Sequence, residues 1–236
     1  MWTLAVLVLI LGVVGSAPGP GAADEATPTE SVTEVDTSCG EQVAARVQAH
    51  YDRVRDLEAK FEQSTLSITL GTGPLGSSEP NRGRVVFAKP GKMRWSYEQP
   101  EPSLVVSDGV TLWLYNPGLN EASRLPVTEG YLTGAALQFL LGEGKLLQEF
   151  AIAARGCGSG EVELELVPLS PASYERLSLV CVESTGEITA TAIVDLFGNQ
   201  TRISFDELRV NLDPPSDVFV FEVPPGVEVI DITAPK

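Results

Sequence analysis

Positive charge is scarce in this 236-residue chain, because 16 lysines and arginines stand against 32 aspartates and glutamates and the formal net charge is -16. Nucleic-acid binding needs a basic patch that neutralises phosphates, so no nucleic-acid partner is expected. The same excess of negative charge should repel anionic membrane surfaces. Hydrophobic residues make up 43% of the chain and charged residues 20%, which is enough apolar material for a packed core.

Groups that carry catalysis or bind metals are equally few. Histidine occurs once, as His50, and no G-x-S-x-G nucleophile motif is present. The cysteines show no zinc spacing, and the acidic residues form no clear acid–base pair. Residues 71–76 formally match G-x-G-x-x-G, but they contain Pro74 and do not open a predicted helix. We therefore predict no enzymatic activity, no metal and no cofactor.

Long hydrophobic runs are absent except at the N-terminus. Residues 2–15 are apolar and uncharged, but a bilayer span needs about 20 residues. Small residues follow, so we interpret residues 1–23 as a signal peptide, although a basic first region is missing. No cysteine follows the run that could carry a lipid anchor, and we expect a soluble exported protein. Residues 24–37 are acidic and rich in Thr, Pro and Glu, which is typical of a flexible leader.

Only three cysteines are present, and export to an oxidising compartment predicts one disulfide and one free thiol. Cys181 is in phase with two leucines on one strand face, so we expect it to be a buried apolar residue. Cys39 and Cys157 each lie beside a glycine at the end of an element, and we predict that they pair. Other pairings, or none, remain open. Closing so long a loop could add about 4–5 kcal/mol to the stability.

The first regular element should be a helix. Ser38 is a candidate N-cap, and Glu41 stands at the third position of a capping box. Apolar residues then recur at three- and four-residue steps, which predicts one buried stripe of a helix: Val43, Val47, Tyr51, Val54, Leu57 and Phe61. A second, short amphipathic helix is expected within residues 128–144, between flanking glycines.

From Gln63 onward the apolar period is two, which is typical of strands. Short turns between the strands favour antiparallel neighbours. Strands are expected at 64–70, 82–89, 92–98, 103–107, 110–115, 121–126, 147–154, 161–168, 175–183, 187–195, 200–210 and 217–222. We predict a mainly β (α+β) fold in one domain, residues 38–236. It would be an incomplete, strongly curved antiparallel β-barrel of about eleven strands, with a helical lid over an apolar cavity.

Aromatic side chains gather in the first half of this sheet. Alternation places Phe87 and Lys89 on one face of their strand, and Trp95 and Tyr97 on one face of the next strand, with Arg94 opposite. A plain aromatic core would explain the rings alone. A core lysine, however, needs a partner or the rim of a cavity for its charged end. The lysine therefore favours a cavity.

These residues also resemble a known family. The segment AKPGKMRWSYEQPEPSLVVSDGVTLWLYNP, residues 88–117, resembles the core signature of the LolA family of periplasmic outer-membrane lipoprotein carrier proteins. VQAHYDRVRDLEAKFEQ, residues 47–63, is similar to the family's first helix and the start of its first strand. VFVFEVPPGVEVID, residues 218–231, is similar to its closing motif. The resemblance covers most of residues 40–232.

The resemblance implies a fold and a non-enzymatic activity. The family fold is an incomplete barrel of about eleven strands with a helical lid. Its members take acylated lipoproteins from an inner-membrane ABC transporter, shield the acyl chains and deliver them to an outer-membrane receptor of the LolB type. The expected cavity wall is Phe61, Val85, Phe87, Met93, Trp95, Tyr97, Trp113 and Tyr115, and the expected lid residues are Leu132, Leu137, Phe139, Leu140 and Leu141.

Two single residues gain roles from the resemblance. Lys89 stands where the family has an arginine that holds the lid closed, which makes it a candidate latch with fewer simultaneous contacts. Met93 stands where the family contacts its inner-membrane partner. The chain itself is expected to be a monomer. Alternatives are a carrier of another lipid or glycolipid, a LolB-like receptor, which the missing anchor cysteine disfavours, and a secreted hydrolase.

Overall fold

The computed structural model describes residues 36–67, 79–127 and 144–232. Its strands form a single twelve-stranded sheet in the order β12-β6-β5-β4-β3-β2-β1-β11-β10-β9-β8-β7. Within these described residues, three helical segments accompany the sheet: α1 (Thr37–Tyr51), α3 (Leu146–Glu149) and the 3-10 helix η2 (Ser216–Phe219). The mainly β architecture predicted from the alternation of apolar residues is therefore confirmed.

The strand bounds follow the predicted ranges closely in the middle of the chain. The strands are β1 (Asp56–Leu66), β2 (Asn81–Ala88), β3 (Lys92–Gln99), β4 (Ser103–Asp108), β5 (Thr111–Asn116), β6 (Glu121–Pro126), β7 (Phe150–Arg155), β8 (Glu161–Pro168), β9 (Tyr174–Val182), β10 (Ile188–Asp195), β11 (Gln200–Val210) and β12 (Glu228–Asp231). Ladders joining consecutive strands are antiparallel, as the short turns require. The one exception to the predicted antiparallel sheet is β12, which pairs in parallel with β6.

The first helix begins earlier than predicted. Asp36, not Ser38, is the N-cap, and its carboxylate accepts a hydrogen bond from the backbone N–H of Cys39. Asp36 also forms a β-bridge with Ala154, so the last two residues of the predicted leader belong to the fold. The remaining residues of the predicted signal peptide and leader lie outside the described residues.

The helix also ends earlier than its apolar stripe suggested. Its last residue is Tyr51, and Leu57 and Phe61 belong to β1. The prediction of a helical stripe through Phe61 was wrong, because Leu57, Ala59 and Phe61 also fit a period of two. Pairing of β1 between β2 and β11, at the centre of the sheet, selects the strand.

The predicted strand at 217–222 was also wrong. These residues form η2 and an extended stretch within a long crossover that connects β11 to β12. We call residues 211–227 the strap. Its start is fixed by Asp56, whose carboxylate accepts hydrogen bonds from the backbone N–H groups of Leu212 (2.6 Å) and Asp213 (3.2 Å).

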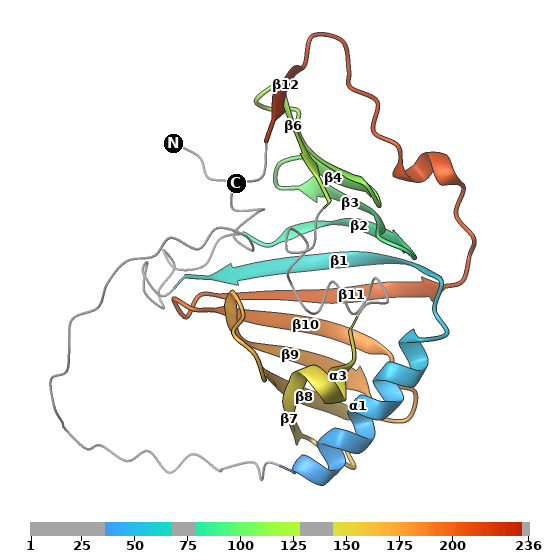
Figure 1. The fold of residues 1–236 in the computed structure, drawn as a ribbon, viewed down its shortest axis with the longest axis vertical. Coiled ribbons are helices and arrows are strands. Elements are labelled where there is room, and N and C mark those ends of the chain that lie inside the picture. Colours follow the sequence, from blue (N-terminus) through green and yellow to red (C-terminus); the bar gives the residue numbers. More distant parts are fainter. Residues whose placement is uncertain (1–35, 68–78, 128–143, 233–236) are drawn as a thin grey trace, which may run out of the picture.

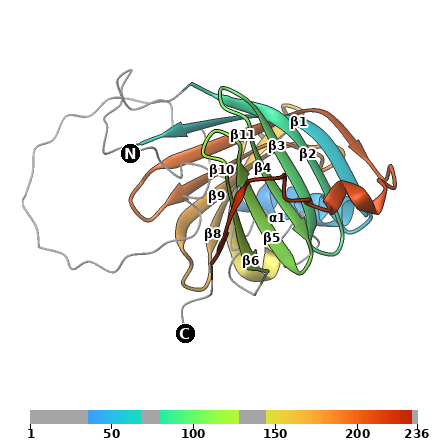
Figure 2. The same cartoon turned by 90° about the horizontal axis from the view of Figure 1, so that it is seen from above.

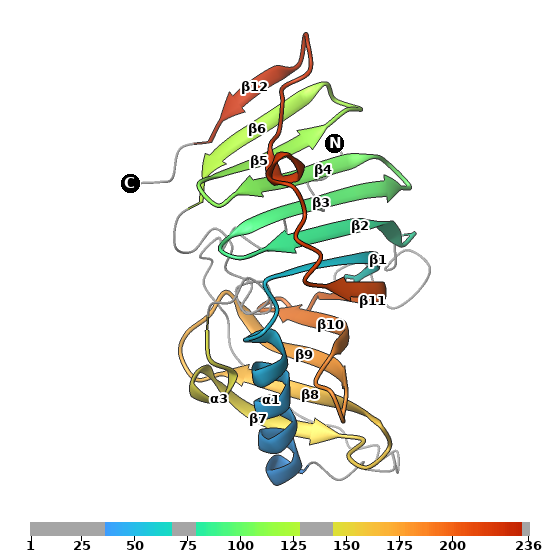
Figure 3. The ribbon, with the colours of Figure 1, turned by 90° about the vertical axis from the view of Figure 1, so that its right-hand side faces the viewer.

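The sheet is strongly curved, and its two faces carry different parts of the chain (Figures 1 and 2). We call the face that carries α1 the inner face. α1 packs on β7 and β8 there, at one end of the strand order. Figure 3 shows the strap running past β3, β4 and β5 before β12 joins the edge of the sheet. Strand pairing and the contact of Phe221 with Trp113 place the strap on the opposite, outer face. The helix and the strap therefore cover different faces and different halves.

The half of the sheet under α1 has an aliphatic core. Val43 and Val47 of α1 are fully buried, together with Leu164, Leu177 and Leu179 of the strands. A disulfide between Cys39 and Cys157 ties the first turn of α1 to the turn between β7 and β8, as the sequence predicted. Cys181 is the buried free thiol that was expected. Its burial raises the pKa of the thiol to about 11, so it stays protonated at neutral pH.

Candidate functional site

The candidate site is the inner face of the other half of the sheet, β1 to β6, which we call the aromatic half. Strand pairing aligns inner-face residues in rows across the strands. One row is Leu57, Phe87, Met93, Ser107, Leu112 and Leu125, and the next is Ala59, Val85, Trp95, Val105 and Leu114. A third row is Phe61, Gly83 and Tyr97. Together the three rows place six of the predicted cavity residues on one face, where all six are buried: Phe61, Val85, Phe87, Met93, Trp95 and Tyr97.

Trp95 is the centre of an aromatic cluster. Its ring centroid lies 4.8 Å from that of Phe61, 5.7 Å from that of Phe87 and 6.3 Å from that of Tyr97. Phe61 also meets Tyr97 edge-on at 5.1 Å. These separations are those of favourable aromatic pairs. The cluster therefore forms a continuous ring-lined surface across β1, β2 and β3.

A glycine makes room for this cluster. Gly83 of β2 pairs with Phe61 on one side and with Tyr97 on the other. A Cβ atom at this position would lie 1.9 Å from the backbone oxygen of Ser96 and 3.0 Å from the Phe61 ring. No rearrangement of a flexible side chain could relieve the backbone contact. The two rings can therefore approach each other only because the residue between them has no side chain.

Two buried polar side chains pair with each other at one end of the cluster. The hydroxyl of Tyr97 donates a hydrogen bond of 3.0 Å to Oε1 of Gln63 on β1. Burial raises the pKa of Tyr97 far above its ordinary value, so the hydroxyl remains a donor at physiological pH. Gln63 was not among the predicted site residues, although it is in phase with Ala59 and Phe61 on β1.

Lys89 contacts the end of α1. Its Nζ donates a 2.6 Å hydrogen bond to the backbone oxygen of Tyr51, the last helical residue. A cation is favoured there, because the last carbonyls of a helix carry partial negative charge. Burial lowers the pKa of Lys89, the nearby carboxylate of Asp52 opposes that shift, and the Lys145 ammonium adds to it. The charged end of Lys89 thus has a partner at the edge of the inner face.

The same turn of α1 also holds the chain that follows the predicted lid. Gln48 donates to the carboxylate of Asp52 (2.8 Å) and accepts from the backbone N–H of Leu146 (3.1 Å). Lys145 lies 3.5 Å from Asp52. The hydrogen bond from Gln48 lowers the pKa of Asp52, and the charge of Lys145 lowers it further. The predicted lid residues themselves lie outside the described residues: Leu132, Leu137, Phe139, Leu140 and Leu141.

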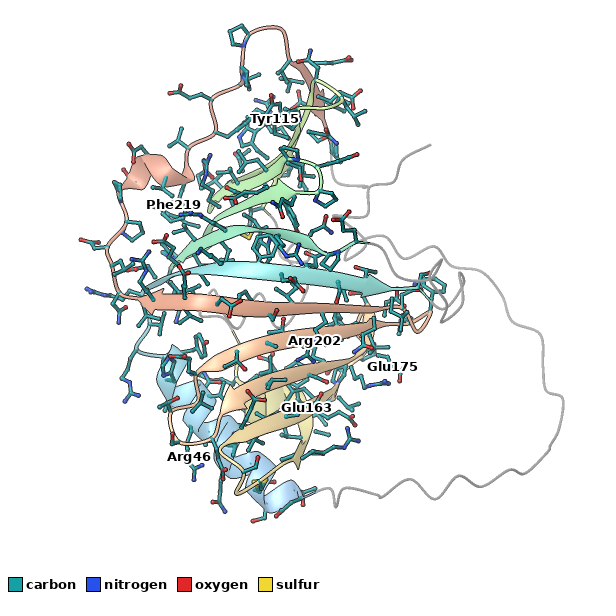
Figure 4. All side chains as sticks on the ribbon, turned by 180° about the vertical axis from the view of Figure 1, so that it is seen from behind. Arg46, Tyr115, Glu163, Glu175, Arg202 and Phe219 are labelled. Carbon is teal, nitrogen blue, oxygen red and sulfur yellow. A yellow bond between two sulfur atoms is a disulfide. The ribbon has the colours of Figure 1, made fainter. Side chains whose placement is uncertain are left out.

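Two of the predicted cavity residues are on the wrong face. Trp113 and Tyr115 alternate with the inner-face leucines of β5, and both rings pack on Phe221 of the strap, at 5.2 and 5.3 Å between centroids. Figure 4, viewed from behind, shows Tyr115 and Phe219 on the face turned away from α1. The strap covers this part of β5 with apolar side chains of its own, and these two rings therefore stabilise the outer face.

The predicted partner contact at Met93 also needs correction. Met93 is 3% exposed and belongs to the main buried cluster, so it offers no surface to a partner in this structure. Arg94, the next residue, faces outward as the alternation predicted, and its Nη1 donates a 3.2 Å hydrogen bond to the backbone oxygen of Val218 in the strap. Arg94 therefore holds the strap on the outer face.

No constellation for chemistry was found in the described parts of the chain. Across residues 36–67, 79–127 and 144–232, no three His, Cys, Asp or Glu residues are grouped so that they could hold a metal ion. In the same residues, none of the helices has the length and apolar character needed to cross a membrane. His50 lies in α1, beside Tyr51, with its ring partly buried. The site that remains is an apolar, aromatic surface with one polar pair.

Comparison with known proteins places this surface in a family. The family model described as "Outer membrane lipoprotein carrier protein LolA" matches residues 52–222. That range contains the aromatic cluster, Lys89 and most of the strap.

Curated relatives carry the same description. An outer-membrane lipoprotein carrier protein of Dechloromonas aromatica is 31% identical over 178 residues, which are 75% of this chain and 81% of the relative. Those of Chromohalobacter salexigens (31% identical; 79% of this chain and 86% of the relative) and Methylibium petroleiphilum (29%; 77% and 91%) are similar over comparable lengths.

A solved structure shares the fold. An uncharacterized conserved protein from Thermus thermophilus superposes with a TM-score of 0.50, at 12% identity, over 81% of this chain and 98% of its own. At this level of identity, the similarity concerns the fold alone.

Proposed function

The chain belongs to the LolA family of outer-membrane lipoprotein carrier proteins, and on that premise we propose that it is a periplasmic carrier of acylated lipoproteins. It would shield their acyl chains after release from the inner membrane and deliver them to the outer membrane, with no chemical step. The observation that carries this proposal is the buried aromatic surface on the inner face of β1, β2 and β3, around Trp95.

The free energy of the cargo explains why a carrier is needed. Each methylene group of an acyl chain costs about 0.8 kcal/mol to hold in water, so a chain of about sixteen carbons costs about 12 kcal/mol. Free diffusion across an aqueous compartment is therefore too rare to be useful. A carrier must cover the chain with apolar surface and still release it, and bulky rings that can repack around a chain suit both steps.

The expected partners follow from the same role. Cargo would come from an inner-membrane lipoprotein-releasing ABC transporter and pass to an outer-membrane receptor of the LolB type where one exists. Lys89 remains our proposed latch, because its contact with Tyr51 lies at the helix turn that also holds residues 145 and 146. A predicted signal peptide, residues 1–23, would bring the protein to the periplasm.

The decisive experiment uses the two tryptophans of the sheet as opposed reporters. Trp95 is on the inner face and Trp113 on the outer face, in contact with the strap. In a Trp2→Phe background, lipid with brominated acyl chains should quench the fluorescence of Trp95 by contact and leave that of Trp113 unchanged. The variants Trp95→Phe and Trp113→Phe separate the two signals and serve as matched controls.

The natural cargo can be identified by mass spectrometry of material extracted from the purified protein. Acylated peptides support the proposal, whereas free lipid or glycolipid would assign the protein to the alternative carrier class. Quenching of Trp113 alone, or of neither tryptophan, would contradict an acyl site on the inner face.

A further inference from the structure

The aromatic cluster contains one polar group that shielding a hydrocarbon chain does not require. Trp95 is 9% exposed, and its Nε1 is buried without a hydrogen-bond partner. Within residues 36–67, 79–127 and 144–232, the only other buried side-chain nitrogen or oxygen without a partner is Nε2 of His50. Unpaired buried donors are rare in proteins, and each one needs a physical explanation.

The aromatic neighbours of Trp95 offer no free acceptor for its N–H group. The closest rings are Phe61 and Phe87, which offer no acceptor oxygen. Tyr97, by contrast, has its hydroxyl paired with Gln63. A phenylalanine at position 95 would supply a large apolar ring without the cost of desolvating an N–H group. A tryptophan is advantageous there only if its N–H gains a partner in another state of the protein.

The position along the strand indicates what that partner is. Inner-face polarity rises along β3 from Met93, through Trp95, to Tyr97 with Gln63. Met93 lies in the row of Phe87, where the only polar side chain, Ser107, is already bonded within the neighbouring turn. An acyl tail over that row would place the polar end of the lipid toward Tyr97. The carbonyl group, which joins tail and polar end, then falls beside Trp95.

We propose that Nε1–H of Trp95 donates a hydrogen bond to the carbonyl oxygen of a bound acyl group. This proposal rests on the proposed function and deepens it, because it assigns a ligand group, an ester or amide carbonyl, and a direction for the chain. Trp95 is then a specificity-determining residue that distinguishes acyl chains from plain hydrocarbon, and the loaded protein satisfies the donor that is unpaired here.

The test compares two lipids that differ only in the carbonyl. A 1-monoacylglycerol and a 1-O-alkylglycerol ether of equal chain length are titrated into the full chain, into Trp95→Phe and into the control Phe61→Leu. One hydrogen bond between neutral partners predicts that the wild type binds the ester about tenfold more tightly. Trp95→Phe should bind both lipids with equal affinity, while Phe61→Leu should bind both more weakly and keep the preference.

A spectroscopic measurement separates a hydrogen bond from general packing. In ¹⁵N-labelled protein, the indole N–H resonance that disappears in Trp95→Phe should move downfield on addition of the ester and much less on addition of the ether. Equal affinity of the wild type for the two lipids, or a preference that survives in Trp95→Phe, would overturn the proposal and leave the carrier function intact. Binding of neither lipid would overturn both.

Discussion

The two halves of the sheet solve the same packing problem with different side chains. Under α1, branched aliphatic residues such as Val47 and Leu164 pack together, and a disulfide ties the helix to the sheet. In the aromatic half, Trp95 and the three rings around it provide the inner surface, whereas α1 packs on β7 and β8. One buried donor in that surface is left unpaired.

This difference shows how one continuous sheet can be stable and still bind a ligand. Aliphatic side chains that interlock with a helix leave few low-energy alternatives, because a close-packed core does not tolerate rearrangement. Large rings joined to the backbone by two rotatable bonds can turn as units and expose area to a ligand. We therefore expect stability to depend mainly on the half under α1, and acyl binding mainly on the aromatic half.

The largest expected effect concerns the disulfide. Replacement of Cys39 and Cys157 by serine releases a loop closed over a sequence separation of 118 residues, and the free energy of unfolding should fall by about 4–5 kcal/mol. Denaturant unfolding of the two proteins measures this change. Acyl affinity, measured under conditions in which both proteins are folded, should be unaltered, and a large loss of affinity would break the division between the halves.

A pair of leucine truncations compares the halves directly. Leu164→Ala, under α1, should cost about 3 kcal/mol of stability and leave acyl affinity unchanged, because the side chain is fully buried in the aliphatic core. Leu114→Ala, beside Val105 on the inner face of the aromatic half, is only partly buried and should cost less stability. We expect that variant to bind acyl probes more weakly. The reverse pattern would contradict the comparison.

A pH titration follows two tyrosines, one in each half. Burial raises the pKa of both Tyr51 and Tyr97 above the ordinary value of about 10. The tyrosines of the unfolded chain ionise first, so the contribution of these two groups to the free energy of unfolding is fully present below pH 10. It is lost as the pH rises, by up to about 1.4 kcal/mol per group and pH unit. Burial also raises the pKa of Tyr174, to about 12. Absorbance at 295 nm should therefore show the late-titrating hydroxyls of three tyrosines, and the variants Tyr51→Phe and Tyr97→Phe assign two of them. Bound acyl chains should delay Tyr97 and not Tyr51.

The smallest expected effect is that of Lys89, at the junction of the halves. Lys89→Met removes a cation from the carbonyl end of α1 and should cost about 0.5–1 kcal/mol at neutral pH. Burial lowers the pKa of Lys89 in the folded protein below its unfolded value of about 10.5. As the pH rises between these two pKa values, the wild type should therefore gain stability relative to the variant. Release of an acyl probe should be faster in Lys89→Met. Unchanged release rates would argue against the latch.

Sequence patterns predicted much of the sheet. The predicted range 161–168 coincides with β8, and 200–210 coincides with β11. In both ranges, alternating apolar residues between clear turns are compatible only with a strand. Helix α1 was found, but its end was not, since residues 54 to 61 fit both a helical and a strand period. Residues 217–222 resemble a strand in composition, but they pair with no neighbouring strand and so belong to the crossover.

The candidate site divides in the same way. Alternation correctly placed Phe87, Trp95 and Tyr97 on one face and Arg94 on the other. The cavity wall expected from the family resemblance was wrong for Trp113 and Tyr115. Both faces of β5 are apolar, and the strap that covers one of them lies about a hundred residues later in the sequence. No local pattern could reveal that the two rings pack on Phe221 or that Asp56 fixes the start of the strap.

The sequence by itself determined most of the strands, the face of each aromatic residue on β2 and β3, and the family, since these depend on short-range periodicity and on local motifs. Tertiary structure decided where α1 ends, what covers each face, which residue holds Lys89 and which buried donor lacks a partner. Those features arise from contacts between segments far apart in the chain, and their energies exist only once the sheet has brought the segments together.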